Sequence, residues 1–183
     1  MSLIRKANGT ICSTNQENIG KTIVFEGEIY FVASNGRQQH NEFSLYNILN
    51  KGNIVNNEYR INDELKLPIN NIVVSHVIKM HDMFKNCEQF NQPLNKWDVS
   101  EVTDMSNMFE GCKQFNQSLN NWDVSEVKRM GAMFKNCEQF NQPLHNWEVF
   151  NVTHMCSMFE GCKQFNQPLN DWEVDDVYRM GDM

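Results

Sequence analysis

The stretch MFKNCEQFNQPLNKWDVS, residues 83–100, indicates the fold because three close copies of it follow. The copies MFEGCKQFNQSLNNWDVS, MFKNCEQFNQPLHNWEVF and MFEGCKQFNQPLNDWEVD begin at Met108, Met133 and Met158, so the repeat is 25 residues long. A unit of this length cannot bury its own apolar face, and packing on its neighbours supplies the missing core. The sequence therefore predicts a stack of coils with one repeat in each.

Two apolar spacings lie inside each repeat. The pattern L-x-x-L-x-L, here Leu94, Trp97 and Val99, predicts a short strand. A helix is predicted by apolar residues at i, i+4, i+7 and i+10. These residues are Met105, Phe109, Cys112 and Phe115. We therefore expect an α/β leucine-rich-repeat solenoid of strand-plus-helix coils.

The solenoid is expected to cover residues 69–183, with a degenerate first coil at 69–93 and regular coils from 94. Val73 stands where the other copies carry Asp or Glu, which predicts that another segment, within about residues 8–66, covers the outer face of this strand. The last coil is truncated at Met183, so we expect the chain to be a fragment of a longer repeat protein.

Residues 1–68 are predicted to form a small α+β cap. The segment KTIVFEGEIYFVAS, residues 21–34, is rich in β-forming residues, and Glu26-Gly27 is a candidate hairpin turn. NEFSLYNILNKG, residues 41–52, predicts a short helix, and residues 57–67 predict one more strand.

The net charge of −7 lies entirely in the repeats. Up to Asp82 there are 8 basic and 8 acidic residues, which leaves 8 and 15 of the 16 and 23 for the remainder of the chain. An acidic array argues against nucleic acid, which needs basic contacts to phosphate. No apolar run reaches the roughly 20 residues of a membrane span, and no intact signal peptide is visible.

Polar positions of the repeat also form columns that predict the stacking register. Two columns alternate in sign, in opposite phase, which favours ion pairs between neighbouring coils. They are Lys85, Glu110, Lys135 and Glu160, and Glu88, Lys113, Glu138 and Lys163. Asn86, Gly111, Asn136 and Gly161 alternate as well, so the repeating unit is better described as a 50-residue pair.

Several columns have a chemical interpretation beside a structural one. The column of Cys87, Cys112, Cys137 and Cys162 lacks zinc-ligand spacing. We expect buried free thiols in this column, and disulfides between neighbouring coils are the alternative. Cys12 and Cys156, outside the column, are expected to be the more reactive thiols. The tryptophan column beginning at Trp97 is predicted to pack in the core rather than bind sugars. The Gln89 and Asn91 columns are predicted to satisfy loop backbone groups.

No catalytic constellation is visible in the sequence. The five histidines, His40, His76, His81, His145 and His154, share no column, and no nucleophile, phosphate-loop or zinc-protease motif occurs. We therefore expect no enzymatic activity, no metal and no cofactor.

The residue between the last two apolar positions of L-x-x-L-x-L should point outward. It is Asp98, Asp123, Glu148 and Glu173 in the four copies. Stacked strands would bring these carboxylates to about 5 Å, where like charges repel unless they are paired or solvated. Each acid could hold a following backbone amide, or together they could form a strip that docks a basic protein surface. The flanking positions of this candidate binding face are Lys96, Asn121, Asn146, Asp171, Asn95, Asn120, His145 and Asn170.

The stretch FNQPLNKWDVSEVTDMSNMF, residues 90–109, resembles the 25-residue repeat of bacterial BspA-like leucine-rich repeat surface proteins, first catalogued as a domain of unknown function in mycoplasmas. The segment at residues 19–34 more weakly resembles one that often precedes such arrays. The resemblance implies a surface-exposed or secreted module used in adhesion or other recognition, with no enzymatic activity and no assigned site residues.

These observations predict a non-enzymatic recognition module with a protein partner such as a host surface protein. Two alternatives stay open. One is a carbohydrate- or mucin-binding module, and the other is a structural spacer in a longer surface protein.

Overall fold

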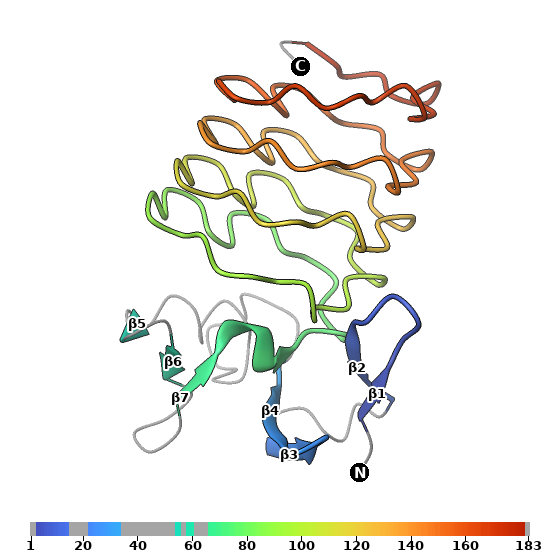
Figure 1. Ribbon diagram of the computed structural model, residues 1–183. Helices are drawn as coiled ribbons and strands as arrows, with labels where there is room; N and C mark the ends of the chain where they lie inside the picture. Colours follow the sequence, from blue (N-terminus) through green and yellow to red (C-terminus); the bar gives the residue numbers. More distant parts are fainter. Residues whose placement is uncertain (1–2, 15–21, 34–53, 56–57, 61–65, 182–183) are drawn as a thin grey trace.

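The computed structural model describes residues 3–14, 22–33, 54–55, 58–60 and 66–181. Its regular elements all lie in the N-terminal part (Figure 1). They are β1 (Leu3–Arg5), β2 (Ile11–Ser13), β3 (Thr22–Phe25), β4 (Glu28–Val32), β5 (Ile54–Val55), β6 (Glu58–Arg60), β7 (Lys66–Pro68), the 3-10 helix η2 (Ile69–Asn71) and β8 (Ile72–Val73).

From Val74 to Gly181 the chain forms coils that stack one above another, away from the N-terminal strands (Figure 1). Residues 74–181 contain no α-helix and no strand, only turns and isolated bridges. The predicted α/β solenoid of strand-plus-helix coils is therefore wrong. The coils stack, but each one is built from turns.

Positive backbone φ angles exclude the predicted helix. Between Met105 and Phe115, Asn107 has φ 56° and Gly111 has φ 74°. A right-handed helix needs a negative φ at every residue, so these two left-handed residues interrupt it within each turn. The equivalent residues of the other coils also have positive φ. They are Asp82, Ala132 and Ser157 at the first position, and Asn86, Asn136 and Gly161 at the second.

The backbone amides of this segment divide between two kinds of partner. The Asn107 and Phe109 amides donate to carbonyls of the next coil, each at 2.9 Å, whereas the Met108 amide donates to the Met105 carbonyl at 3.1 Å and closes a turn. An α-helix would need every amide to reach back four residues within the same segment. Because alternate amides serve the next coil, the segment forms successive turns and an inter-coil ladder instead.

The predicted strand is replaced by turns in the same way. The Trp97 amide donates to the Leu94 carbonyl at 3.0 Å, and the Val102 amide donates to the Val99 carbonyl at 2.9 Å. Neighbouring coils instead form parallel bridges a few residues later, at the column of Lys79, Asp104, Arg129, His154 and Arg179.

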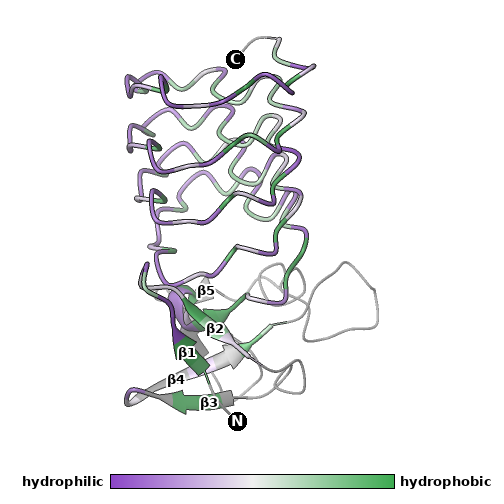
Figure 2. Cartoon of the chain, turned by 90° about the vertical axis from the view of Figure 1, so that its right-hand side faces the viewer, coloured by the Kyte–Doolittle hydropathy of each residue, from purple (hydrophilic) through white to green (hydrophobic). Residues whose placement is uncertain are grey.

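Stacked aromatic rings fill the interior of the coils. Phe84, Phe109, Phe134 and Phe159 follow one another through the stack, with ring centroids 5.5, 5.7 and 5.8 Å apart. Offset-stacked rings at this spacing add to the stabilisation from apolar burial. Hydrophobic and hydrophilic residues alternate along every coil, which places one set in this core and the other on the surface (Figure 2).

The N-terminal strands cover one end of the stack. β3 and β4 pair as an antiparallel hairpin, and Glu26 and Gly27 at its turn have φ 52° and 81°, as a two-residue hairpin turn requires. This confirms the predicted turn. β4 then pairs in parallel with β8 of the first coil, with Val32 opposite Val73.

The covering segment expected over Val73 is present. Val73 is buried in a small apolar cluster with Leu3, Ile11, Ile23, Tyr30 and Val32. The cover extends further than predicted, because the β1–β2 hairpin begins at Leu3 and its Ile11 amide donates to the Lys96 carbonyl at 2.7 Å. The hairpin thereby contacts the next coil as well as the first.

Two further expectations concern the remainder of the N-terminal part. The single strand predicted within residues 57–67 corresponds to β6 and β7, which pair antiparallel and form a three-stranded sheet with β5. The helix predicted at residues 41–52 lies outside the described residues.

Candidate binding surfaces

The first carboxylate of the predicted acidic strip is not available to a partner. Asp98 is only 4% exposed, and its Oδ2 lies 2.8 Å from the Nζ of Lys6 in the loop after β1. Its Oδ1 also accepts the Ser100 amide at 3.3 Å and the Ser100 hydroxyl at 2.9 Å. The prediction that Asp98 faces a ligand is therefore wrong, because the N-terminal segment supplies a cation and covers it.

The other three carboxylates of the strip are exposed. Asp123, Glu148 and Glu173 form no ion pair with any described basic residue. The Asp123 Oδ1 accepts the amide and the hydroxyl of Ser125, at 3.1 and 2.7 Å. Asp123 therefore holds the following turn and still presents its charge to solvent.

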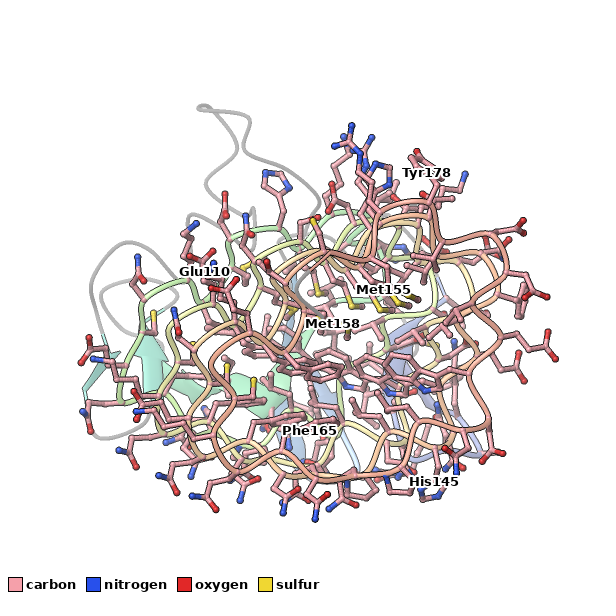
Figure 3. The ribbon with its side chains drawn as sticks, turned by 90° about the horizontal axis from the view of Figure 1, so that it is seen from above. Glu110, His145, Met155, Met158, Phe165 and Tyr178 are labelled. Atoms are coloured by element: carbon pink, nitrogen blue, oxygen red, sulfur yellow. The ribbon has the colours of Figure 1, made fainter. Side chains whose placement is uncertain are left out.

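Two open depressions adjoin along this acidic face and share Asn146 and Glu148. The first is also lined by Asn8, Asn120, Asn121, Asp123 and Ser125. The second is also lined by His145, Phe150, Asp171 and Glu173. Figure 3 shows His145 at one corner of the coil, pointing away from the core. The structure thus brings together most of the predicted face.

The remaining predicted residues form structural contacts at the N-terminal end of the face. Lys96 donates to the Tyr30 hydroxyl at 3.1 Å and lies over its ring, and Asn95 Oδ1 accepts from Asn70 at 2.7 Å. Asn170, by contrast, is exposed in the last coil.

Side chains one coil apart also contact within the face. The Asn120 Nδ2 lies 3.1 Å from the His145 Nε2, and the Asn120 Oδ1 accepts the Asn146 amide at 3.0 Å. The Asn121 carbonyl accepts from Asn8 at 3.1 Å. These bonds hold the coils in register beneath the exposed carboxylates.

The tryptophans are core residues, as predicted. Trp97, Trp122, Trp147 and Trp172 are buried. Each indole Nε1 donates to a carbonyl of the preceding coil at 2.9–3.2 Å, for example Trp122 to Leu94. A buried tryptophan needs such a partner for its N–H. An aromatic stripe that stacks on sugars is therefore not formed by these residues.

The side chains of the Asn91 column accept hydrogen bonds from backbone amides of the next coil, which confirms their structural interpretation. The Asn91 Oδ1 accepts the Asn116 amide at 2.9 Å and the Gln117 Nε2 at 3.0 Å. The same two bonds recur at Asn116 and at Asn141.

The cysteine column consists of free thiols, but the expected burial is wrong for Cys87, which is exposed. Cys112 and Cys137 are buried, and their Sγ atoms donate to the carbonyls of Phe84 and Phe109, each at 3.0 Å. Burial raises the pKa of both thiols, and it raises the pKa of Cys162 to about 12. Outside this column Cys156 is exposed, but Cys12 is buried and its pKa is raised by burial, against the expectation that Cys12 is reactive.

The two alternating charge columns form the predicted ion pairs between coils. The pairs are Lys85–Glu110 at 2.8 Å, Lys113–Glu88 at 2.8 Å, Lys135–Glu160 at 2.6 Å and Lys163–Glu138 at 2.8 Å. This side of the stack is therefore close to neutral, and the uncompensated charge lies on other faces.

A second charged surface was missed by the sequence reasoning. The bridge column carries Lys79, Arg129 and Arg179, and the preceding positions carry Lys128 and Tyr178. We call this surface the basic corner. Lys79, Arg129 and Arg179 are each 50 positions from the next in the sequence, so no local cluster reveals the surface. The available signal was the departure from Thr-Asp at 103–104 to Lys-Arg at 128–129 and Tyr-Arg at 178–179.

Comparison with known families supports the repeat interpretation. The model of the family described as "Mycoplasma protein of unknown function, DUF285" matches residues 29–136 and 79–183, which is more than half of the chain. The chain belongs to this DUF285 family. No curated protein and no solved structure matches it.

Two further observations concern this DUF285 chain. None of its described helices is long and apolar enough to cross a membrane. Within the described residues, no group of three His, Cys, Asp or Glu side chains is placed to hold a metal ion.

Proposed function

We propose that this chain is a non-enzymatic recognition module that binds a protein with a basic surface through its acidic face. The observation that carries the proposal is the alignment of Asp123, Glu148 and Glu173 in successive coils, over two adjoining depressions. The Trp147 and Trp172 rings, one residue before Glu148 and Glu173, have centroids 6.3 Å apart. Like charges held at that distance destabilise a fold unless a partner or solvent compensates them.

The chemistry of the face suits a protein partner. Uncompensated carboxylates steer an oppositely charged surface and raise the association rate more than the affinity. Phe150, 44% exposed in the same depression, offers an apolar contact beside the charges. A rim of charge around an exposed aromatic residue is a common composition for a protein–protein contact.

The resemblance to BspA-like surface proteins supports placing the module at the cell surface or in the secreted fraction, with adhesion to host cells as its use. A stack of coils repeats one binding surface several times, which favours contact with an extended partner.

The test measures how many beads coated with the chain stay bound to cultured epithelial cells. The acidic-face variant is Asp123→Asn, Glu148→Gln and Glu173→Gln together. The matched control is Glu88→Gln, Glu110→Gln and Glu138→Gln, which changes the net charge equally but in the ion-pair columns. We expect beads coated with the acidic-face variant to bind the cells weakly and with little dependence on salt concentration. Beads coated with the control variant should bind as the parent chain does, with the same salt dependence.

Trypsin treatment of the cells should abolish retention if the partner is a protein. Equal losses in the two variants would contradict the acidic face as the site. Retention that survives trypsin but not glycosidase treatment would support the carbohydrate alternative, and no retention of the parent chain would support a spacer.

A further inference from the structure

We propose that the basic corner binds an anionic polysaccharide, whose sulfate or carboxylate groups pair with Lys128, Arg129 and Arg179. This inference does not depend on the acidic face. It concerns another column of the coils, with the opposite charge.

The backbone fixes the spacing of the corner. Parallel bridges join Lys79 to Asp104, Asp104 to Arg129, Arg129 to His154 and His154 to Arg179. Bridged backbones are about 4.8 Å apart, so Arg129 and Arg179 lie roughly 10 Å apart, with Lys128 beside the first. A linear ligand that runs along the stack axis can therefore contact both arginines.

The cations of the corner are mostly uncompensated. Arg129 lies 3.6 Å from Asp104, but its side chain is 58% exposed. In the described part of the chain, no carboxylate forms an ion pair with Lys128 or Arg179. Since Lys128 and Arg179 have no described ion pair and the Arg129 pair is largely exposed, the strip suits an external anion even in a chain of net charge −7. Arginine also recognises a carboxylate or sulfate through two parallel hydrogen bonds.

Tyr178 adds an aromatic surface to the corner. It is 69% exposed, and its ring contacts His154 edge-on with centroids 4.7 Å apart. The His154 Nδ1 lies 2.9 Å from the Thr153 hydroxyl, so the histidine is itself held in place. Figure 3 shows Tyr178 at the edge of the coil beside nitrogen-bearing side chains that point outward. An aromatic ring with a polar hydroxyl suits a sugar, which has both C–H faces and hydroxyl groups.

The charge density favours a polysaccharide over nucleic acid. Duplex DNA carries one negative charge per roughly 1.7 Å, and its binding proteins neutralise many phosphates at once. The corner offers only Lys79, Lys128, Arg129 and Arg179, with Asp104 among them. Single-stranded nucleic acid is held by successive stacked bases, whereas Tyr178 is the one exposed aromatic residue among the described residues of these two columns.

The experiment measures binding of the chain to immobilised heparin, which is sulfated, and to hyaluronan, which carries only carboxylates. The corner variant is Lys128→Gln, Arg129→Gln and Arg179→Gln. The matched control is Lys113→Gln, Lys135→Gln and Lys163→Gln, which removes the same charge from the ion-pair columns. Melting curves of both variants verify that they are folded.

We expect the corner variant to bind heparin at least about tenfold more weakly, with a smaller salt dependence, and the control to stay within about twofold of the parent chain. Binding to heparin alone would assign a sulfate ligand, and binding to both polymers would show that carboxylates suffice. Absence of binding to both polymers, or equal losses in the two variants, would overturn the proposal. Tighter binding to poly(dT) than to heparin, lost in the same variant, would overturn the polysaccharide assignment.

Discussion

The side chain of Asn86 occupies the space in which a Cβ at Gly111 would lie. Its Oδ1 is 2.7 Å from that position, and its Cα is 3.3 Å away. The same relationship recurs between Asn136 and Gly161, where the Asn136 Oδ1 also lies too close for a Cβ. All four residues have positive φ, which both Asn and Gly adopt readily. The alternation of Asn and Gly therefore has a steric cause: where Asn86 or Asn136 projects toward the next coil, that coil carries glycine.

Gly111→Ala should destabilise the fold more than Gly9→Ala. Both residues have positive φ, but nothing lies within 4 Å of a Cβ at Gly9. Both changes carry a cost of roughly 1 kcal/mol for a left-handed alanine, and only Gly111→Ala adds overpacking of about 1 kcal/mol or more. Denaturant unfolding measures the difference. Adding Asn86→Gly should remove it, and a persistent difference in the double variant would contradict the steric explanation.

Trp122→Ala should cost about 3–5 kcal/mol, the usual range for truncating a buried aromatic residue. Trp122 is buried, and its removal also leaves the Leu94 carbonyl without the indole N–H. The neighbouring change Asn121→Ala affects an exposed side chain and should stay within about 0.5 kcal/mol. Thermal melting of the two variants tests the assignment, and equal shifts would be incompatible with an inward-facing Trp122.

Lys6→Met should destabilise the contact between the N-terminal hairpin and the coils. Asp98 is almost fully buried, and Lys6 is its cationic partner at 2.8 Å. Loss of a hydrogen bond to a buried charge costs about 1.5–3 kcal/mol. Lys79→Met, at an exposed residue, is the control. In a double-mutant cycle, Asp98→Asn should remove most of the penalty of Lys6→Met, and purely additive effects would argue against the pair.

Iodoacetamide at pH 8 should modify Cys156 well before Cys112 and Cys137. The thiolate is the reactive form, and burial raises the pKa of the two column thiols, so they stay protonated as well as inaccessible. Peptide mass spectrometry of the native and the denatured chain distinguishes the sites. Early labelling of Cys137 in the native chain would show that the thiols of the column are accessible to the reagent.

The same pKa shifts predict how stability changes at alkaline pH. The folded-state pKa of Cys112 and Cys137 lies above the ordinary value of 9.0, so the unfolded chain loses these protons first as pH rises. Their contribution to stability is complete below pH 9 and decreases above it. Unfolding midpoints at pH 8 and pH 10, compared with those of a Cys112→Ala and Cys137→Ala variant, measure this contribution. An equal decrease in the variant would assign it to other groups.

The 25-residue period and the inward and outward columns can be predicted from the sequence alone. Repeats 25 residues apart must stack to bury their apolar residues, so the buried tryptophans, the ion pairs and the Asn91 ladder followed from the columns alone. Glu26-Gly27 was also readable as a turn, because its conformation depends on those two residues themselves.

The construction of each coil and the exposure of its charges depend on contacts between coils that the sequence pattern does not show. An apolar residue at every third or fourth position suits a helix and a series of turns equally. The choice depends on whether the Asn107 and Phe109 amides bond within their own segment or to a coil 24 residues further on. Asp98 differs from Asp123 because Lys6 forms an ion pair with it, and Arg129 and Arg179 share one column only because the coils stack. Such partners lie far apart in the sequence, so local spacing does not predict them.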